Sequence, residues 1–230
     1  MLVATPMLKG LKLAFPESKV SIGVGDWARP ILNNNPYLDE VVSCNAPWHN
    51  KQNCRFPANS PKTFFEGLLY ILFSKESRYI SSKKFTHGID VLGSRQGSWL
   101  MRRAKITNRF GVKGYAGGDN WCTKCIDFKE ERKVAVAGLK FLNLMKAVVD
   151  IEPRPTIFLT ENEVNEAQRK WNANDTKMKK IIIAPGGGFL EKCWGDENFN
   201  LLTELLLKET SLVISIIGSK EDRVRIKVHE

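Results

Sequence analysis

The sequence predicts an α/β protein built on parallel sheets, and three stretches carry this prediction. Residues 1–42 alternate between helical and extended patterns. The β-branched run at 181–184 breaks into three glycines and is followed by a lysine and a helix start at Asp196. An apolar extended run at 212–217 leads into Gly218 and another helical pattern. Alternating strands and helices are typical of units whose strands pair in parallel.

Composition limits the class of protein. The chain has 230 residues, of which 43% are hydrophobic and 26% charged, which suits one large or two small globular domains. Its apolar runs are far shorter than the ~20 residues that a bilayer span needs, and no signal peptide is visible at the amino terminus. We therefore expect a cytoplasmic protein whose five cysteines are reduced thiols.

Capping residues define the amino-terminal elements. Thr5-Pro6 predicts a helix start, with Thr5 as the N-cap and proline at the first helical position. An extended run then covers 20–24, Asp26 can cap a short helix, and a further extended run covers 38–42. A doubly wound domain normally begins with a strand, whereas this chain begins with a helix.

The next helix begins at the Ser60-Pro61 cap and has a strongly apolar face. The residues of that face are Phe64, Phe65, Leu68, Leu69 and Leu72. We interpret it as a core helix. The alternative is a helix that lies on a membrane surface, because basic residues surround it, namely Lys62, Lys75, Arg78, Lys83 and Lys84.

The middle of the chain combines predicted strands at 87–92 and 106–112 with a helical pattern at 130–149. Arg95 and Gln96 follow the first of these strands, at the end where open α/β sheets bind ligands. We expect a loop at Tyr115–Asp119 and through the Cys122–Cys125 region.

The net charge of +10 is concentrated in this region. No acidic residue lies between Asp90 and Asp119, whereas six basic residues do: Arg95, Arg102, Arg103, Lys105, Arg109 and Lys113. Such a field favours an anionic partner, either a phosphorylated substrate, an anionic membrane surface or a nucleic acid. A solvated basic face is the alternative. The sequence lacks the signatures of common nucleic-acid-binding folds, so we expect no nucleic acid partner.

Cys122-Thr-Lys-Cys125 has the spacing of half a zinc site. Cys44, His49 and Cys54 are the residues that would have to complete it, but no second pair lies nearby in sequence. Two loop cysteines are the simpler interpretation, and we expect no metal.

The carboxyl-terminal part begins with a linker at 151–155 and a capping box from Thr160 to Glu163. We therefore expect two domains, 1–152 and 153–230. In the second, the strand at 181–184 is followed by Gly186, Gly187 and Gly188 and then by Lys192. A strand followed by glycines, a lysine and the start of a helix is an order that suits the binding of an anionic ligand. The loop matches neither the Walker A nor the dinucleotide pattern, and a structural turn is the alternative.

Taken in order, several stretches resemble glycosyltransferase family 9, the heptosyltransferases. They are Met1-Leu-Val-Ala-Thr5-Pro6, Asn35-Pro36-Tyr-Leu-Asp39-Glu40, Ile89-Asp90-Val-Leu-Gly93, Ala184-Pro-Gly-Gly with Lys192-Cys-Trp194, and Ile217-Gly218-Ser-Lys-Glu221. The resemblance implies a GT-B fold of two Rossmann-like, doubly wound domains, with the acceptor bound by the first and the nucleotide-sugar by the second. It implies inverting transfer of heptose from ADP-heptose to the inner core of lipopolysaccharide without a metal or cofactor. The acceptor is an anionic, lipid-linked glycan, so it also implies peripheral contact with the inner face of the cytoplasmic membrane.

The resemblance also assigns residues. Gly186, Gly187, Gly188, Lys192 and Glu221 would contact the donor, and Lys192 would neutralise its diphosphate. Thr5, Arg95 and Gln96 would contact the acceptor.

Two elements of the family pattern are not found. The aspartate proposed as general base would precede Met1, and a later group of donor contacts would follow Glu230. We therefore expect a fragment truncated at both ends, inactive by itself, with the first strand of one domain and much of the other missing. A non-catalytic nucleotide- or phosphate-binding module is the alternative function.

Overall fold

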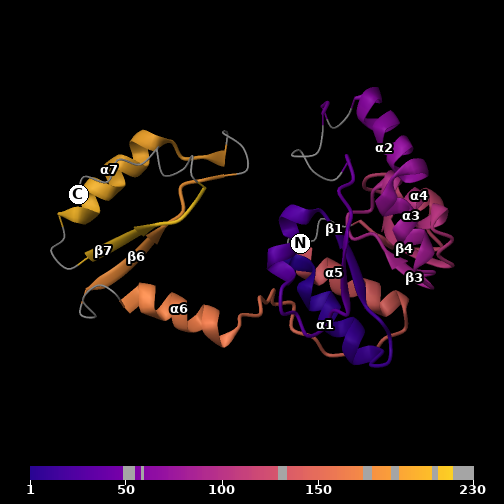
Figure 1. Ribbon diagram of the computed structural model, residues 1–230, viewed down its shortest axis with the longest axis horizontal. Coiled ribbons are helices and arrows are strands. Elements are labelled where there is room, and N and C mark those ends of the chain that lie inside the picture. The colour runs from indigo at the N-terminus through magenta and orange to yellow at the C-terminus, as the bar shows by residue number, and fades with distance from the viewer. Residues whose placement is uncertain are drawn as a thin grey trace. The chain divides into compact units, whose positions relative to one another are not determined.

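The computed structural model describes residues 1–48, 55–57, 60–128, 134–172, 178–187, 192–208 and 212–219. The chain divides into two compact units, Met1–Leu159 and Thr160–Glu230, which are considered separately here (Figure 1). Helices and parallel strands alternate in both, so the predicted α/β class is confirmed.

The first unit begins with helices and ends with one. Its elements are η1 (Leu2–Ala4), α1 (Thr5–Ala14), β1 (Ser21–Val24), η2 (Asp26–Leu32), β2 (Glu40–Ser43), α2 (Pro61–Phe73), α3 (Lys75–Ser82), β3 (His87–Ile89), α4 (Arg95–Arg103), β4 (Asn108–Lys113), η3 (Gly118–Trp121), β5 (Lys124–Asp127) and α5 (Val134–Leu144). The second unit contains α6 (Glu161–Asn172), β6 (Lys179–Ile183), α7 (Asp196–Leu207) and β7 (Leu212–Ile216).

The strand pairs that the structure describes are all parallel. In the first unit β1 pairs with β2, and β3, β4 and β5 form a second sheet in that order. Within the described residues β1 and β3 therefore each pair along one edge only. In the second unit β6 pairs with β7 over five residue pairs, from Lys179 opposite Leu212 to Ile183 opposite Ile216.

The main core of the first unit lies between α1, α5 and the strand β4. Phe141 and Leu142 of α5 are 1% and 2% exposed and pack with Met7 of α1 and Phe110 of β4. A second cluster joins Leu8 on the same helix α1 to β1, η2 and β2. Helix α1 is thus held on two sides.

Two local predictions are confirmed. Ser60 caps α2 by accepting a hydrogen bond from the Thr63 backbone N–H at 3.2 Å. Thr160 and Glu163 form the capping box of α6, with Glu163 N donating to Thr160 Oγ1 at 3.2 Å and Thr160 N donating to Glu163 Oε2 at 2.7 Å.

Two others are wrong. Thr5 is not an N-cap: it is the first residue of α1, and Ala4 precedes it without a side-chain cap. Residues 124–127 are the strand β5, not a loop, because β4 offers a free edge to which this segment hydrogen-bonds in parallel. The helix predicted at 130–149 is α5, which ends at Leu144 rather than at Val149; residues 130–133 lie outside the described part of the chain.

The interpretation of α2 as a helix that buries its large residues is also wrong. Its buried positions are Thr63, Gly67 and Ile71. At Gly67 an added methyl group would lie 3.2 Å from the Trp48 ring, so only a small residue fits there. Four large side chains point the other way and are exposed, namely Phe65, Leu69, Leu72 and Phe73, whereas the ring of Phe64 lies 5.6 Å from that of Trp99 on α4.

Tight backbone packing follows β3. Gly93 adopts a positive φ of 61°, and a methyl group added at Gly118 would lie 2.2 Å from the Gly93 carbonyl oxygen. Because that obstacle is backbone, no rotamer change relieves it. The two segments can approach this closely only while Gly118 lacks a side chain, and a methyl group at Gly93 would itself lie 2.5 Å from Val112 Cβ.

This packing predicts the effect of two glycine substitutions. Gly118→Ala should lower the free energy of unfolding by about 3 kcal/mol, because the methyl group overpacks the turn. Gly138→Ala is the control: nothing lies within 4 Å of a methyl group there, and alanine stabilises a helix relative to glycine by about 1 kcal/mol. Urea denaturation of both variants measures the difference. Equal stability of the two would contradict the close approach.

Candidate functional site

The carboxyl ends of β6 and β7 form one edge of the second unit. The Ile217 backbone N–H donates to the Ile183 carbonyl at 2.9 Å, one step past the last pair of the ladder. The segments that leave the two strands, 184–187 and 217–219, therefore start side by side. Parallel pairing places the predicted glycine loop at the edge where α/β sheets bind ligands.

The loop after β6 returns to its own beginning. A methyl group added at Gly187 would lie 3.3 Å from Cys193 Sγ and 3.4 Å from Lys192 Cβ, so residues on either side of 188–191 are in contact. Gly186, Gly187 and Lys192 are exposed. The arrangement brings bare backbone close to the base of a lysine side chain, and bare backbone and a cation are the groups that an anionic ligand needs.

The start of α7 is fixed by local contacts. Gly195 precedes the helix with a positive φ of 101°, and the Asn198 side chain donates to the Trp194 carbonyl at 2.6 Å. Asp196 and Glu197 occupy the first turn. These carboxylates already interact with the positive end of the helix dipole, and Lys192 is the basic residue among the described residues between β6 and α7.

The structure brings three of the five predicted donor residues to this edge, namely Gly186, Gly187 and Lys192. The other two, Gly188 and Glu221, lie outside the described residues. The donor role of all five stays a prediction.

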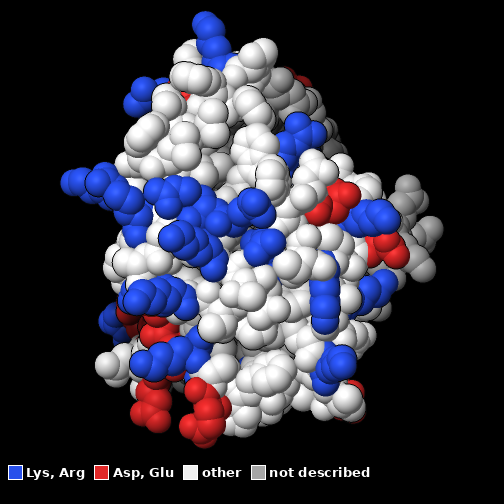
Figure 2. Space-filling model, turned by 90° about the vertical axis from the view of Figure 1, so that its right-hand side faces the viewer, with Lys and Arg blue, Asp and Glu red and all other residues white. Residues whose placement is uncertain are grey.

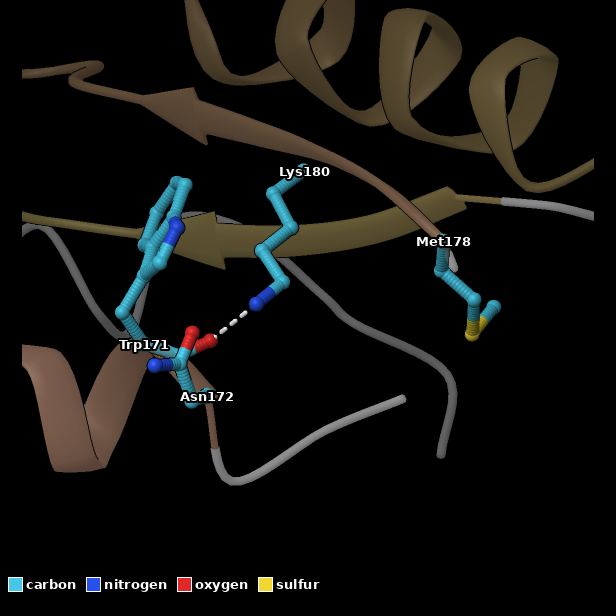
Figure 3. A pocket seen from close by; sticks show the side chains of 4 residues that line it. All are labelled: Trp171, Asn172, Met178 and Lys180. Carbon is cyan, nitrogen blue, oxygen red and sulfur yellow. Dashed lines mark hydrogen bonds between the residues drawn. The ribbon is translucent and has the colours of Figure 1, made fainter. Parts of the chain in front are cut away.

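A shallow hollow of about 320 Å³ lies at the opposite end of the same strand and is lined by Trp171, Asn172, Met178 and Lys180. Figure 3 shows Lys180 reaching toward the end of α6. Its ammonium group donates to the Trp171 carbonyl and lies 5.1 Å from the centroid of the Trp171 ring. Because this lysine is held by its neighbours at the amino end of β6, the hollow is not part of the donor edge.

In the first unit, Asp90 organises the turn between β3 and α4. Its carboxylate accepts hydrogen bonds from Leu92 N at 3.0 Å, Ser94 N at 2.8 Å and Ser94 Oγ at 2.9 Å. Ser94 in turn caps α4 by accepting from Gly97 N at 3.0 Å. The carboxylate thereby fixes the start of α4, which carries the two residues predicted to contact an acceptor.

Arg95 and Gln96 diverge from this helix start. The Arg95 backbone N–H donates to the Ala116 carbonyl at 3.1 Å, and its guanidinium group lies beside Gly117. The Gln96 side chain instead lies beside Gly67 of α2. Only Arg95 therefore faces the loop that follows β4 at the carboxyl edge of the sheet.

An aromatic pair lies at the same edge. Tyr115 follows β4 and Phe128 follows β5, and their rings stack with centroids 4.6 Å apart. Both side chains are exposed, by 62% and 48%. Exposed flat rings suit contact with the apolar face of a sugar, and Tyr115 directly precedes the Ala116–Gly117 segment that Arg95 contacts. The sequence analysis missed this pair, since the residues are thirteen positions apart and only the pairing of β4 with β5 joins them.

Thr5 has a structural environment. It is 3% exposed, its hydroxyl group donates to the Leu2 carbonyl at 2.8 Å, and the same oxygen accepts from Thr156 N at 3.0 Å. These bonds tie α1 to the segment that ends the first unit. Thr5 shares no hydrogen bond with Arg95 or Gln96, and its contact with an acceptor stays a prediction.

The basic residues of segment 95–113 do not form a single surface, because they have different partners. Arg109 donates to the carbonyls of Trp121 and Ile106, both at 2.6 Å, and so holds a loop. Arg102 lies 4.5 Å from the centroid of the Trp121 ring. Arg95 and Arg102 are at opposite ends of α4. Figure 2 shows Lys and Arg gathered across the middle of the face that carries α2, α3 and α4.

The described carboxylate at the end of β1 is a poor candidate for a general base. Asp26 accepts hydrogen bonds from Ser43 Oγ at 2.6 Å and Asn45 Nδ2 at 2.8 Å. These two bonds, with Ser43 the larger cause, lower the pKa of the carboxyl group. A lowered pKa weakens proton abstraction near neutral pH.

The cysteines form no metal site within the described part of the chain, where no cluster of three His, Cys, Asp or Glu could hold an ion. Cys44 is buried, while His49 and Cys54 lie outside that part. Cys122 Sγ donates to the Gly118 carbonyl at 3.0 Å. Burial, together with nearby Cys125, raises the pKa of the Cys122 thiol to about 12.

The sequence model of glycosyltransferase family 9 (heptosyltransferase) matches residues 74–229, and the chain belongs to this family. This match confirms the predicted resemblance to the family. No curated protein matches the sequence.

The chain has the same α/β fold as solved structures of GT-B heptosyltransferases. E. coli ADP-heptose lipopolysaccharide heptosyltransferase II is 15% identical, with a TM-score of 0.65, over 98% of this chain and 62% of that one. A family 9 glycosyltransferase from Veillonella parvula is 18% identical, with a TM-score of 0.66, over 96% and 59%. E. coli heptosyltransferase WaaC with ADP is 13% identical, with a TM-score of 0.62, over 97% and 65%. The chain spans about three fifths of the length of these proteins.

The pKa of Cys122 predicts the pH dependence of its alkylation. An unfolded cysteine has a pKa of about 8.5, so its rate with iodoacetamide should level off above that pH. The folded thiol keeps its proton up to about 12, so its rate should keep rising from pH 8.5 to 11. Stabilisation by the protonated thiol is complete below about pH 8.5 and is lost as the pH approaches the folded value.

Peptide mapping by mass spectrometry, with and without urea, isolates Cys122 from the other cysteines. At pH 9 the folded protein should react more than about a hundredfold slower at this residue. A plateau in the folded protein near pH 9 would contradict the raised pKa.

Proposed function

We propose that this chain binds ADP-heptose and an anionic glycan acceptor for heptosyl transfer to the inner core of lipopolysaccharide. The carboxyl-terminal unit binds the donor and the amino-terminal unit binds the acceptor. The transfer inverts the anomeric configuration and needs no metal, and the protein works on the cytoplasmic side of the membrane. Family membership supports this class of reaction. Solved relatives with a similar fold carry ADP and ADP-2-deoxy-2-fluoro heptose.

The observation that carries the donor proposal is the contact between Gly187 and the Lys192 segment at the β6–β7 edge. Glycosyl transfer breaks the bond between the sugar and the diphosphate, so negative charge grows on the departing phosphate. A lysine ammonium group held there stabilises that charge more in the transition state than in the ground state. Backbone N–H groups of Gly186 and Gly187 supply further hydrogen bonds to the phosphate oxygens.

The acceptor proposal rests on the β3–β4–β5 edge. Arg95 offers a planar, bidentate donor for an acidic group, and the stacked Tyr115 and Phe128 offer a flat surface for a sugar ring. An acidic glycan presents both features. Asp26 is not assigned as the catalytic base, since its hydrogen bonds from Ser43 and Asn45 hold that carboxylate in its weakly basic form.

The alternative function is a nucleotide- or phosphate-binding module without catalysis. Both functions require the donor edge, but only the transferase requires the acceptor edge. Binding of ADP alone therefore does not distinguish the two functions, whereas specific binding of the glycan acceptor does.

Lys192→Ala should weaken ADP binding about tenfold, which corresponds to about 1.4 kcal/mol, because a charge-assisted contact with the diphosphate is lost. Isothermal titration calorimetry of the 230-residue chain measures it. Lys208→Ala is the matched control: it removes the same charge from an exposed lysine after the last turn of α7. An unchanged affinity in Lys192→Ala, or equal losses in both variants, would remove Lys192 from the donor site.

Arg95→Ala should weaken binding of heptose-free lipopolysaccharide about tenfold, because the ion pair with its acidic groups is lost. Arg103→Ala, at the other end of α4, is the control of equal charge. Surface plasmon resonance in mild detergent measures both. Loss of binding in neither variant would favour the non-catalytic module.

A further inference from the structure

Helix α2 is apolar on two faces, and only one is covered. Thr63 and Ile71 are 1% and 3% exposed, and their face packs against α4 and Trp48. On the opposite side the exposed fractions are 59% for Phe65, 43% for Leu69 and 66% for Phe73. Leu72 extends this exposed surface, at 38%. We call these four residues the outer face of α2.

A contiguous set of large apolar side chains is unusual on a protein surface and marks an interaction site. The outer face covers more than two helical turns, since residues 65, 69 and 72 or 73 follow helical spacing. It contains rigid aromatic rings, which bury much apolar area when they leave water.

Basic residues border both ends of the outer face. Lys62 lies at the start of α2, with its ammonium group 5.2 Å from the centroid of the Phe56 ring. Arg78 donates to the Phe73 carbonyl at 3.1 Å and so lies directly at the end of the helix. Lys75 starts the next helix between them in sequence. In Figure 2 an uncharged area lies above the band of Lys and Arg.

The nearby acidic residues do not cancel this charge. Glu76 points inward, where it accepts hydrogen bonds from the Tyr70 hydroxyl group and, at 2.7 Å, from Asn45 N. Glu40 pairs with Lys83 at 2.8 Å. Glu66 is the acidic residue of α2 itself. Lys62, Lys75 and Arg78 therefore leave a positive border.

We propose that the outer face of α2 docks on an anionic phospholipid bilayer. Its Phe and Leu side chains enter the boundary between headgroups and acyl chains, while Lys62, Lys75 and Arg78 contact the anionic headgroups. At thirteen residues, α2 spans about 20 Å and is too short to cross a bilayer of about 30 Å. No helix among the described residues is long and apolar enough to do so.

The positive border of the outer face favours a lipid surface over a second copy of the chain as its partner. A symmetric dimer through the outer face would bring each basic border against its equivalent, and like charges repel across such a contact. An anionic bilayer satisfies the apolar centre and the basic border together. This inference is independent of donor and acceptor binding.

Vesicle co-sedimentation tests the docking. The chain should bind vesicles of phosphatidylglycerol and phosphatidylethanolamine, less tightly as salt rises, and should bind phosphatidylcholine vesicles weakly. Phe65→Ser combined with Leu69→Ser should lower binding to the anionic vesicles about tenfold or more. These side chains are exposed, so near-ultraviolet circular dichroism and ADP affinity should stay unchanged.

The control is Leu201→Ser combined with Leu205→Ser on α7. These leucines are 56% and 53% exposed and have the same spacing of four residues, so they match the test pair, and vesicle binding should persist. Three outcomes would overturn the proposal. The first is equal vesicle binding by both double variants, and the second is equal binding to neutral and anionic vesicles. The third is a chain that does not bind vesicles but forms concentration-dependent dimers, which are lost in Phe65→Ser/Leu69→Ser.

Discussion

Parallel strand pairing is the constraint on which the rest of the structure depends. A parallel ladder aligns the carboxyl ends of its strands, so loops far apart in sequence start at one edge. In the second unit this alignment places the segment after Ile183 beside the segment after Ile216. In the first unit it places Tyr115 beside Phe128. Each unit therefore has one edge where ligand-binding groups can gather.

Turns at these edges decide which side chains face the ligand. The Asp90 carboxylate holds the β3–α4 turn through three hydrogen bonds, and the approach of Gly118 to Gly93 locks the adjacent loop against it. Arg95 then faces that loop while Gln96 turns to α2. In the donor loop, contact of Gly187 with Lys192 and Cys193 serves the same purpose. Positioning in both units rests on close backbone approach, which explains the glycines there.

The charge of the protein is divided among different tasks. Arg109 binds backbone carbonyls and Lys83 pairs with Glu40, so they stabilise the fold. Arg95 lies at the edge of the sheet, and Lys62, Lys75 and Arg78 border the exposed apolar face of α2. The net charge of +10 is therefore distributed over several separate surfaces. Whether a basic side chain stabilises the fold or remains at a surface depends on which carbonyls and carboxylates the fold brings near it.

The sequence by itself determined the α/β class, the caps at Ser60 and Thr160, the family, and the order of glycine, lysine and helix around Lys192. These are local features, because capping and helical or extended periodicity depend on neighbours within a few residues. Only the tertiary structure decided that residues 124–127 form a strand, that α2 turns its large side chains outward, and that the Thr5 hydroxyl group is bonded within the fold. Periodicity shows that a helix has an apolar face, but contacts between distant segments decide what covers it. In α2 the backbone at Gly67 approaches the Trp48 ring and Thr63 is buried, whereas Phe65, Leu69 and Phe73 are left at the surface.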